Sequence, residues 1–309
     1  MRVVFAGTPE VALPSLRAIA ASPHEIVGIV TRPDAPAGRG RTLRPSPVGE
    51  LGAELGVPVL KPRSAKDADF ATELAALRPD VCPVVAYGSL VPRRIIDIPR
   101  FGWVNLHFSL LPAWRGAAPV QHAILHGDEV TGATAFLLEE GMDTGPVLGT
   151  MTETIRPADT SGALLGRLAE AGAGLLVAAL DGLERGSITP VPQSADGVSM
   201  APKITVADGE IRWNAPAFAI DRRVRACTPA PGAWTTFRET RLKIGRLKPA
   251  APDDLQLAPG ELRTTKKAVY VGTGTTPVCL DVVQPHGKKA MPAADWARGV
   301  RVDEGETLR

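Results

Sequence analysis

The chain has 309 residues, 44% hydrophobic and 22% charged, a composition that is typical of a globular protein long enough for two domains. Its three cysteines, Cys82, Cys227 and Cys279, form no C-x-x-C pair, which argues against a disulfide framework or a zinc site and favours a reducing compartment. The apolar start is too short for a signal peptide, and no run of about 18 unbroken apolar residues occurs. We therefore expect a cytoplasmic protein with no membrane span.

The net charge of +2 is unevenly distributed. Residues 206–309 carry 17 Lys and Arg against 12 Asp and Glu, whereas residues 1–205 carry 18 against 21. A basic C-terminal third is compatible with a polyanionic partner such as a nucleic acid, and equally with an ordinary solvated basic face.

Short apolar segments alternate with helical patterns in the first part of the chain. This alternation predicts a parallel α/β sheet with right-handed crossovers. The longest helical pattern carries Leu164, Leu168, Leu175, Ala179 and Leu183 at helical spacing, which is typical of a core-facing stripe. We expect strands at 2–6, 26–30, 57–60, 80–87, 103–108 and 133–138, and helices at about 10–21, 47–55, 65–77 and 160–184.

The pattern changes after residue 187. A stretch with Pro190, Pro192 and polar residues is typical of a linker, and short β-rich segments broken by turns follow a helical patch at about 215–226. We expect a first domain over 1–187, a linker over 188–205 and a small β-barrel domain over 206–309. The expected barrel strands include 234–237, 241–247, 268–271 and 278–283.

Residues 105–119, NLHFSLLPAWRGAAP, hold the strongest chemical pattern. Alternate side chains of a strand share a face, so Asn105 and His107 face the same space where the strand ends. An amide donor for an oxyanion and an imidazole that moves protons near neutral pH are suited to acyl transfer. A structural histidine is the alternative. Pro112 ends regular structure, and the exposed backbone of Ser109–Pro112 suits a planar ligand.

Three further motifs are compatible with a function or with ordinary structure. Asp143 lies in a loop bounded by glycines. It either only stabilises the turn or orients His107 and favours its charged form. The basic loop 31–47 is either a mobile surface loop or an arm that grips phosphates. His122 and His126 have i, i+4 spacing, but the sequence offers no H-E-x-x-H and no evident third ligand, so we expect no metal.

Taken together, these segments resemble the methionyl-tRNA formyltransferase family. The Asn-x-His…Asp set alone is shared with other folate-dependent formyltransferases and hydrolases, whereas the arginine loop and the basic C-terminal domain resemble the tRNA enzymes. The similar segments, which run nearly end to end, are 5–9, 33–40, 105–119, 141–145, 222–226, 229–233 and 284–289.

The resemblance implies a Rossmann-like formyltransferase domain followed by a barrel similar to the OB fold. It implies 10-formyltetrahydrofolate as formyl donor and initiator methionyl-tRNA as acceptor. We expect a monomer that needs no metal. Asn105, His107 and Asp143 fall on the family's catalytic positions. The donor-binding positions are Tyr87, Gly88, Ser109, Leu110, Leu111 and Pro112, and Arg39 falls on the position that engages the tRNA acceptor stem. We expect Arg41 and Arg44 of the same basic loop to bind tRNA phosphates as well.

Two other functions remain possible from the residues. A formyltransferase acting on a sugar nucleotide or a purine precursor would use the same three side chains without a basic barrel. A non-catalytic tRNA-binding protein would not need Asn105, His107 and Asp143 together.

Overall fold

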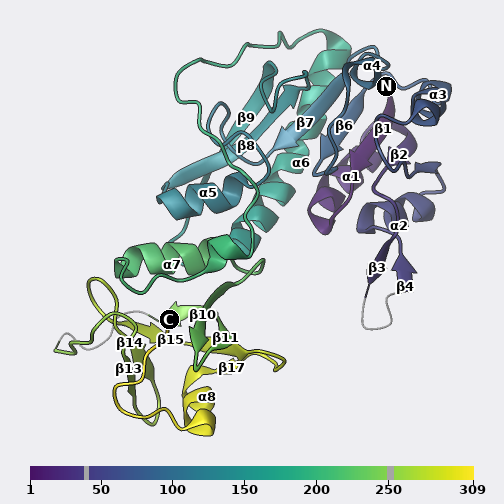
Figure 1. The fold of residues 1–309 in the computed structure, drawn as a ribbon. Helices are drawn as coiled ribbons and strands as arrows, with labels where there is room; N and C mark the ends of the chain where they lie inside the picture. Colours follow the sequence, from purple (N-terminus) through teal and green to yellow (C-terminus); the bar gives the residue numbers. More distant parts are fainter. Residues whose placement is uncertain (38–41, 249–253) are drawn as a thin grey trace. The chain divides into compact units, whose positions relative to one another are not determined.

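The computed structural model describes residues 1–37, 42–248 and 254–309. These residues fall into two compact units (Figure 1). The N-terminal unit comprises Met1–Pro119, Val130–Thr154 and Leu165–Ala201, and the C-terminal unit comprises Val120–Glu129, Ile155–Leu164 and Pro202–Arg309.

A seven-stranded sheet forms the centre of the N-terminal unit, in the order β5-β2-β1-β6-β7-β8-β9. The first five strands are parallel, as predicted, but β8 and β9 are antiparallel to their neighbours. Strand β9 has no predicted counterpart, because polar and glycine residues interrupt the apolar pattern along this half-exposed strand. The strands are β1 (Arg2–Gly7), β2 (Glu25–Val30), β5 (Val59–Leu60), β6 (Cys82–Val85), β7 (Trp103–His107), β8 (Val130–Leu137) and β9 (Val147–Thr154).

Helices connect the parallel strands, as the alternating pattern predicted. Helix α2 begins where Ser46 Oγ accepts a hydrogen bond from the Gly49 N–H at 3.0 Å and where Pro47 occupies the first turn. Phe70 and Trp103 are fully buried with the apolar strand residues in one core cluster. The helices are η1 (Glu10–Ala12), α1 (Leu13–Ala20), α2 (Pro47–Glu54), α3 (Ala68–Ala76), α4 (Arg93–Ile96), α5 (Pro119–His126) and α6 (Ser161–Arg185).

Helix α6 is apolar because it is packed against the sheet. Gly172 lets it approach β7 closely, since a Cβ there would lie 3.1 Å from the Leu106 side chain. Leu176 and Leu180 are fully buried, whereas Leu175 and Leu183, which were expected in the stripe, are half-buried. By length and composition α6 is the one helix of the described residues that could cross a membrane, and 44% of its apolar window is buried.

The segment expected as a loop at 31–47 contains a short antiparallel hairpin. Strands β3 (Ala35–Ala37) and β4 (Thr42–Arg44) pair with Ala35 opposite Arg44. The side chains of β4 are exposed. The hairpin therefore lies outside the apolar core, and for that reason no hydrophobic pattern in the sequence predicts it.

The C-terminal unit is β-rich, as predicted. Two four-stranded antiparallel sheets, β10-β11-β16-β17 and β12-β15-β14-β13, share a core in which Phe237 and Trp296 meet edge to face with ring centroids 5.1 Å apart. The expected strand 278–283 is two strands, one in each sheet, which separate at Asp281. The elements are η2 (Ala207–Gly209), α7 (Ala217–Ala226), β10 (Ala233–Phe237), β11 (Thr240–Ile244), β12 (Leu247–Lys248), β13 (Leu262–Thr264), β14 (Val269–Val271), β15 (Val278–Leu280), β16 (Val282–Pro285), β17 (Met291–Pro292) and α8 (Ala293–Val300).

Candidate active site

Strand β7 places Asn105 and His107 on one face, near the carboxyl end of the parallel part of the sheet. This end of a parallel sheet is where α/β proteins commonly bind ligands. His107 is only 6% exposed, and its ring meets that of Phe136 edge to face. Asn105 is half-buried, and no described residue forms a hydrogen bond with its side-chain amide. The amide is thus available to a ligand.

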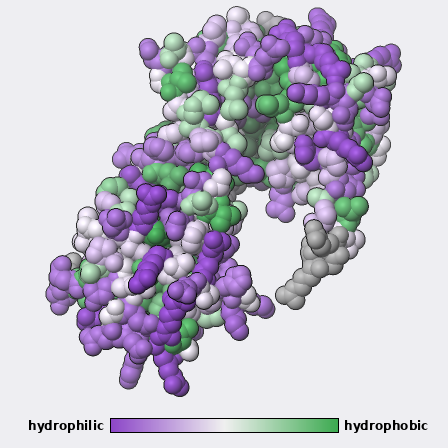
Figure 2. Space-filling view, viewed as in Figure 1, coloured by the Kyte–Doolittle hydropathy of each residue, from purple (hydrophilic) through white to green (hydrophobic). Residues whose placement is uncertain are grey.

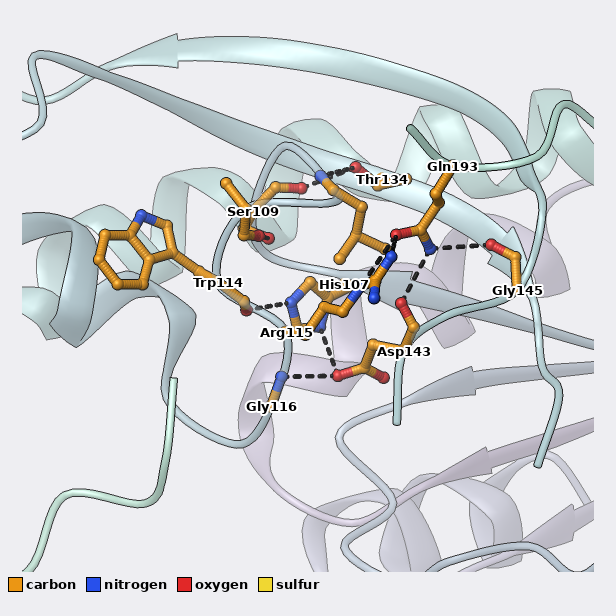
Figure 3. Close-up of polar contacts among 11 residues, drawn as sticks. His107, Ser109, Trp114, Arg115, Gly116, Thr134, Asp143, Gly145 and Gln193 are labelled. Carbon is orange, nitrogen blue, oxygen red and sulfur yellow. Dashed lines mark hydrogen bonds and ion pairs between the residues drawn. The ribbon is translucent and has the colours of Figure 1, made fainter. Parts of the chain in front are cut away.

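The loop after β7 is held in place by buried hydroxyl groups (Figure 3). Thr134 Oγ1, on β8, donates to the Ser109 carbonyl at 2.7 Å and accepts from the Leu111 N–H at 3.2 Å. Ser109 Oγ donates to the Ala113 carbonyl at 2.6 Å. These bonds satisfy the backbone groups of a loop that the sheet ladder does not pair.

Two loops converge on the His107 ring (Figure 3). Nε2 donates a hydrogen bond to the Trp114 carbonyl at 2.9 Å, and Nδ1 lies 3.7 Å from Asp143 Oδ2. The same Asp143 oxygen accepts from the Gly116 N–H at 2.8 Å. Both Trp114 and Asp143 have left-handed backbones, with φ of 60° and 52°. Such conformations are uncommon for residues other than glycine and are concentrated at functional sites.

Burial lowers the pKa of His107 below its usual value, even though the Asp143 carboxylate and the Trp114 carbonyl each act to raise it. We expected Asp143 to favour the charged imidazole. Its effect has that direction, but the loss of solvation outweighs it. The resting ring is therefore neutral near pH 7, with its proton on Nε2 and a lone pair on Nδ1. The protonated His107 that the sequence suggested is therefore not the resting state near pH 7.

The segment from Val191 to Ala201, expected as part of a linker, belongs to the N-terminal unit and contacts both of these loops. Gln193 accepts two hydrogen bonds from the Arg115 guanidinium and donates two to the carbonyls of Asp143 and Gly145. Gln193 carries no signal in the sequence, because it lies in a polar, proline-containing stretch without periodicity.

The expected donor-binding residues differ in their surroundings. Ser109 and Leu111 are buried, and Leu110 and Pro112 are half-buried in the loop that Thr134 anchors. Tyr87 is only 2% exposed and belongs to the core cluster with Phe70 and Trp103, and its place beside the donor stays a prediction. Burial raises the pKa of its phenol. Its neighbour Gly88 is exposed.

The arginines expected to bind tRNA are only partly described. Arg39 and Arg41 lie outside the described residues. Arg44 ends strand β4, and its side chain is exposed. The location of Arg44 is therefore compatible with a contact to phosphate, and the structure adds no partner for it among the described residues.

Histidines that could hold a metal are already engaged in hydrogen bonds or ion pairs. His122 Nε2 donates to the Pro202 carbonyl, and His126 Nδ1 donates to the His122 carbonyl. His24 Nε2 lies 3.2 Å from Asp181 and Nδ1 lies 3.6 Å from Glu184, so these three side chains gather close together.

Comparison with known proteins gives the same family along the whole chain. Residues 1–180 match the formyl transferase family, and residues 203–301 match the formyl transferase C-terminal domain. The methionyl-tRNA formyltransferase of Salinispora tropica is 62% identical over 308 residues, with 100% of both chains covered. That of Streptomyces coelicolor is 63% identical over 309 residues, covering 100% of this chain and 99% of the relative.

Solved structures agree with the fold. HypX from Aquifex aeolicus in complex with tetrahydrofolic acid has a TM-score of 0.67 at 19% identity, over 99% of this chain. The chain spans about half of HypX, 48% of its length. The methionyl-tRNA formyltransferase from Clostridium thermocellum has a TM-score of 0.59 at 14% identity, covering 82% of this chain and 95% of that one. On the strength of its full-length relatives, this chain belongs to the methionyl-tRNA formyltransferase family.

Proposed function

We propose that the protein transfers the formyl group of 10-formyltetrahydrofolate to the α-amine of methionine on initiator methionyl-tRNA, with Asn105, His107 and Asp143 as the catalytic residues. The observation that supports this best is the position of His107. The ring is buried between the Trp114 carbonyl and the Asp143 carboxylate, on the same face as the Asn105 amide. The product would be N-formylmethionyl-tRNA, which serves translation initiation.

The reaction begins with the neutral α-amine. The pKa of such an amine is about 7.7–8.0 in peptides, so part of it is unprotonated at neutral pH. Its nitrogen attacks the formyl carbon, and the carbonyl oxygen becomes an oxyanion. The Asn105 side-chain N–H donates to that oxygen. An oxyanion donor of this kind commonly contributes about 100- to 1,000-fold in rate.

His107 then handles the proton that the attacking amine releases. The lone pair on Nδ1 accepts the proton, directly or through one water, and the imidazolium so formed faces the Asp143 carboxylate. The C–N bond to the folate N10 breaks, and His107 returns the proton to that nitrogen. Asp143 orients the ring and stabilises its charged form, so the pair needs neither a metal nor a covalent nucleophile.

The remaining assignments concern substrates and domains. We assign donor binding to Ser109, Leu110, Leu111 and Pro112, together with Tyr87 and the exposed Gly88. We assign tRNA phosphates to Arg39, Arg41 and Arg44 and to the basic C-terminal domain, whose surface is largely hydrophilic on the face in Figure 2.

The chain's organisation forms part of the same proposal. We propose a catalytic domain over 1–187, a connection over 188–205 and a tRNA-binding domain over 206–309. We further propose a cytoplasmic monomer, in which Cys82, Cys227 and Cys279 are free thiols buried within the fold.

Single-turnover formylation tests the function and the residues together. The enzyme is mixed with 10-formyltetrahydrofolate and charged initiator tRNA, beside uncharged initiator and charged elongator tRNA. We expect formylation of the charged initiator alone, a loss of about 100- to 1,000-fold in Asn105→Ala, and of about 100- to 10,000-fold in His107→Ala. Near-wild-type rates in folded variants would remove these residues from the mechanism, and formylation of a sugar nucleotide instead would replace the acceptor.

A further inference from the structure

The segment Val191–Ala201 lies along the two loops that contact His107, and we name it the strap. At its start, Val191 and Val147 exchange backbone hydrogen bonds of 2.7 and 2.9 Å. Near its end, the Arg115 N–H donates to the Ser199 carbonyl at 2.9 Å, and Ser199 Oγ accepts from the Trp114 N–H at 2.9 Å. The strap is thereby attached on both sides of the site by backbone pairing.

Gln193 joins the two loops across the middle of this arrangement (Figure 3). Its Oε1 accepts from Arg115 Nε at 3.1 Å and Nη2 at 2.7 Å, within the loop that supplies the Trp114 carbonyl. Its Nε2 donates to the carbonyls of Asp143 and Gly145, at 2.8 Å each. Both N–H groups and the oxygen of the Gln193 amide are thus bonded to the two loops that contact His107.

We infer that Gln193 is a positioning residue for formyl transfer, which holds the Asp143 carboxylate in place beside His107 by fixing the loop from both of its amide hydrogens. The inference rests on the proposed function only in assigning chemistry to the His107–Asp143 pair.

The backbone of the Asp143 loop explains why such a residue is needed. Asp143 has a left-handed φ of 52°, and Gly145 lies so close to the Leu137 carbonyl that a Cβ would be 1.8 Å from its oxygen. A short acidic loop in an uncommon conformation does not keep its shape by itself. The Asp143 carboxylate also accepts a hydrogen bond from the Gly116 N–H. A shift of the loop would therefore change the distance of 3.7 Å between Asp143 Oδ2 and His107 Nδ1.

A displacement of the Asp143 loop can be measured through the pKa of His107, because that pKa depends on the groups around the ring. The Asp143 carboxylate approaches from the glycine-bounded loop, the Trp114 carbonyl from the loop after β7, and the uncharged Phe136 ring from β8. Asp143 acts to raise the pKa of His107 against the lowering effect of burial. If the loop moves away, that contribution weakens, and the pKa of His107 falls further.

Four variants of the full-length enzyme test the inference. Gln193→Ala removes every contact. Gln193→Glu keeps an acceptor for Arg115 but has no N–H to donate to the Asp143 and Gly145 carbonyls. Ser194→Ala is the matched control, because its exposed side chain bonds only to the Asp196 N–H among the residues that the structure describes. Asp143→Asn supplies the background in which Gln193 should no longer matter.

We expect Gln193→Ala and Gln193→Glu each to lower kcat by about 10- to 100-fold, with little change in KM for donor or tRNA, because misplacement of a catalytic group by about 1 Å has such effects. Ser194→Ala should match wild type. Combined with Asp143→Asn, Gln193→Ala should cost much less than it does alone. In parallel, NMR titration of the His107 ring should give a lower pKa in Gln193→Ala, in the direction that Asp143→Asn produces, whereas the new carboxylate of Gln193→Glu itself acts to raise that pKa.

The inference is overturned if folded Gln193→Glu retains the wild-type kcat, if the pKa of His107 is unchanged in Gln193→Ala, or if the losses in Gln193 and Asp143 are fully additive. Urea unfolding of each variant establishes that it is folded. If Gln193→Ala does not fold, the kcat of Gln193→Glu decides the test. The ring titration needs no substrate. If wild-type enzyme fails to formylate methionyl-tRNA, the proposed function fails, while the titration still decides the role of Gln193.

Discussion

Thr134→Val should loosen the donor-binding loop at its anchor on β8. Thr134 is fully buried, and its hydroxyl serves both the Ser109 carbonyl and the Leu111 N–H. Valine has nearly the same shape, so the substitution opens no cavity. It removes only the hydroxyl, and two buried backbone groups lose their partner.

The expected loss follows from those two groups. Each buried donor or acceptor left without a partner costs about 1–3 kcal/mol. Partial rearrangement of the loop reduces the sum, so we expect the free energy of unfolding to fall by about 2–4 kcal/mol, out of a total of about 5–15 kcal/mol for a typical protein. Because the loop itself moves, KM for the formyl donor should rise while KM for charged tRNA stays unchanged.

Urea unfolding and donor-dependent initial rates measure the two effects. Thr131→Val is the matched control, since Thr131 is also buried on β8 at 3% exposure but makes no hydrogen bond to the loop among the described residues. We expect it to change the unfolding free energy by less than about 1 kcal/mol. Equal destabilisation by the two substitutions, or an unchanged donor KM in Thr134→Val, would refute the anchoring role.

Three other predictions concern packing, pH and salt. Gly132→Ala should lower Tm by disrupting the β8–β9 ladder, because its Cβ would lie 1.9 Å from the Met151 carbonyl oxygen; an unchanged Tm would contradict the tight approach. Because burial lowers the pKa of folded His107 below about 6.5, the unfolded chain binds more protons as pH falls below that value, and stability falls with it. His107→Gln should therefore lose less unfolding free energy than wild type between about pH 7 and pH 5, and equal losses would refute this. Arg44→Ala should reduce the slope of log affinity for tRNA against log salt by about 1, as one phosphate contact requires, and an unaltered slope would exclude the contact.

Local patterns were sufficient for much of the fold. The alternation of short apolar strands with helical segments predicted the parallel sheet, which β5, β2, β1, β6 and β7 confirm. Strands β1, β2 and β6 are buried over most of their length, so each is an apolar run that is visible in a few residues. Strand β7 combines buried apolar residues with Asn105 and His107, and β5 is a half-buried pair of residues at the edge. Strand β9 carries no such run, since it pairs at the edge, and the direction of β8 and β9 depends on connections that no local pattern encodes.

Part of the site could likewise be predicted from local sequence, and part depends on the tertiary structure. The spacing of Asn105 and His107 by itself placed an amide and an imidazole on one face of a strand, because the period of a strand is fixed by its backbone. That Asp143 lies beside His107 depends on contacts between residues far apart in the chain, and so does the role of Gln193. The charge state of His107 was likewise decided by tertiary structure, because the cost of burying a charge depends on everything that excludes water from the ring.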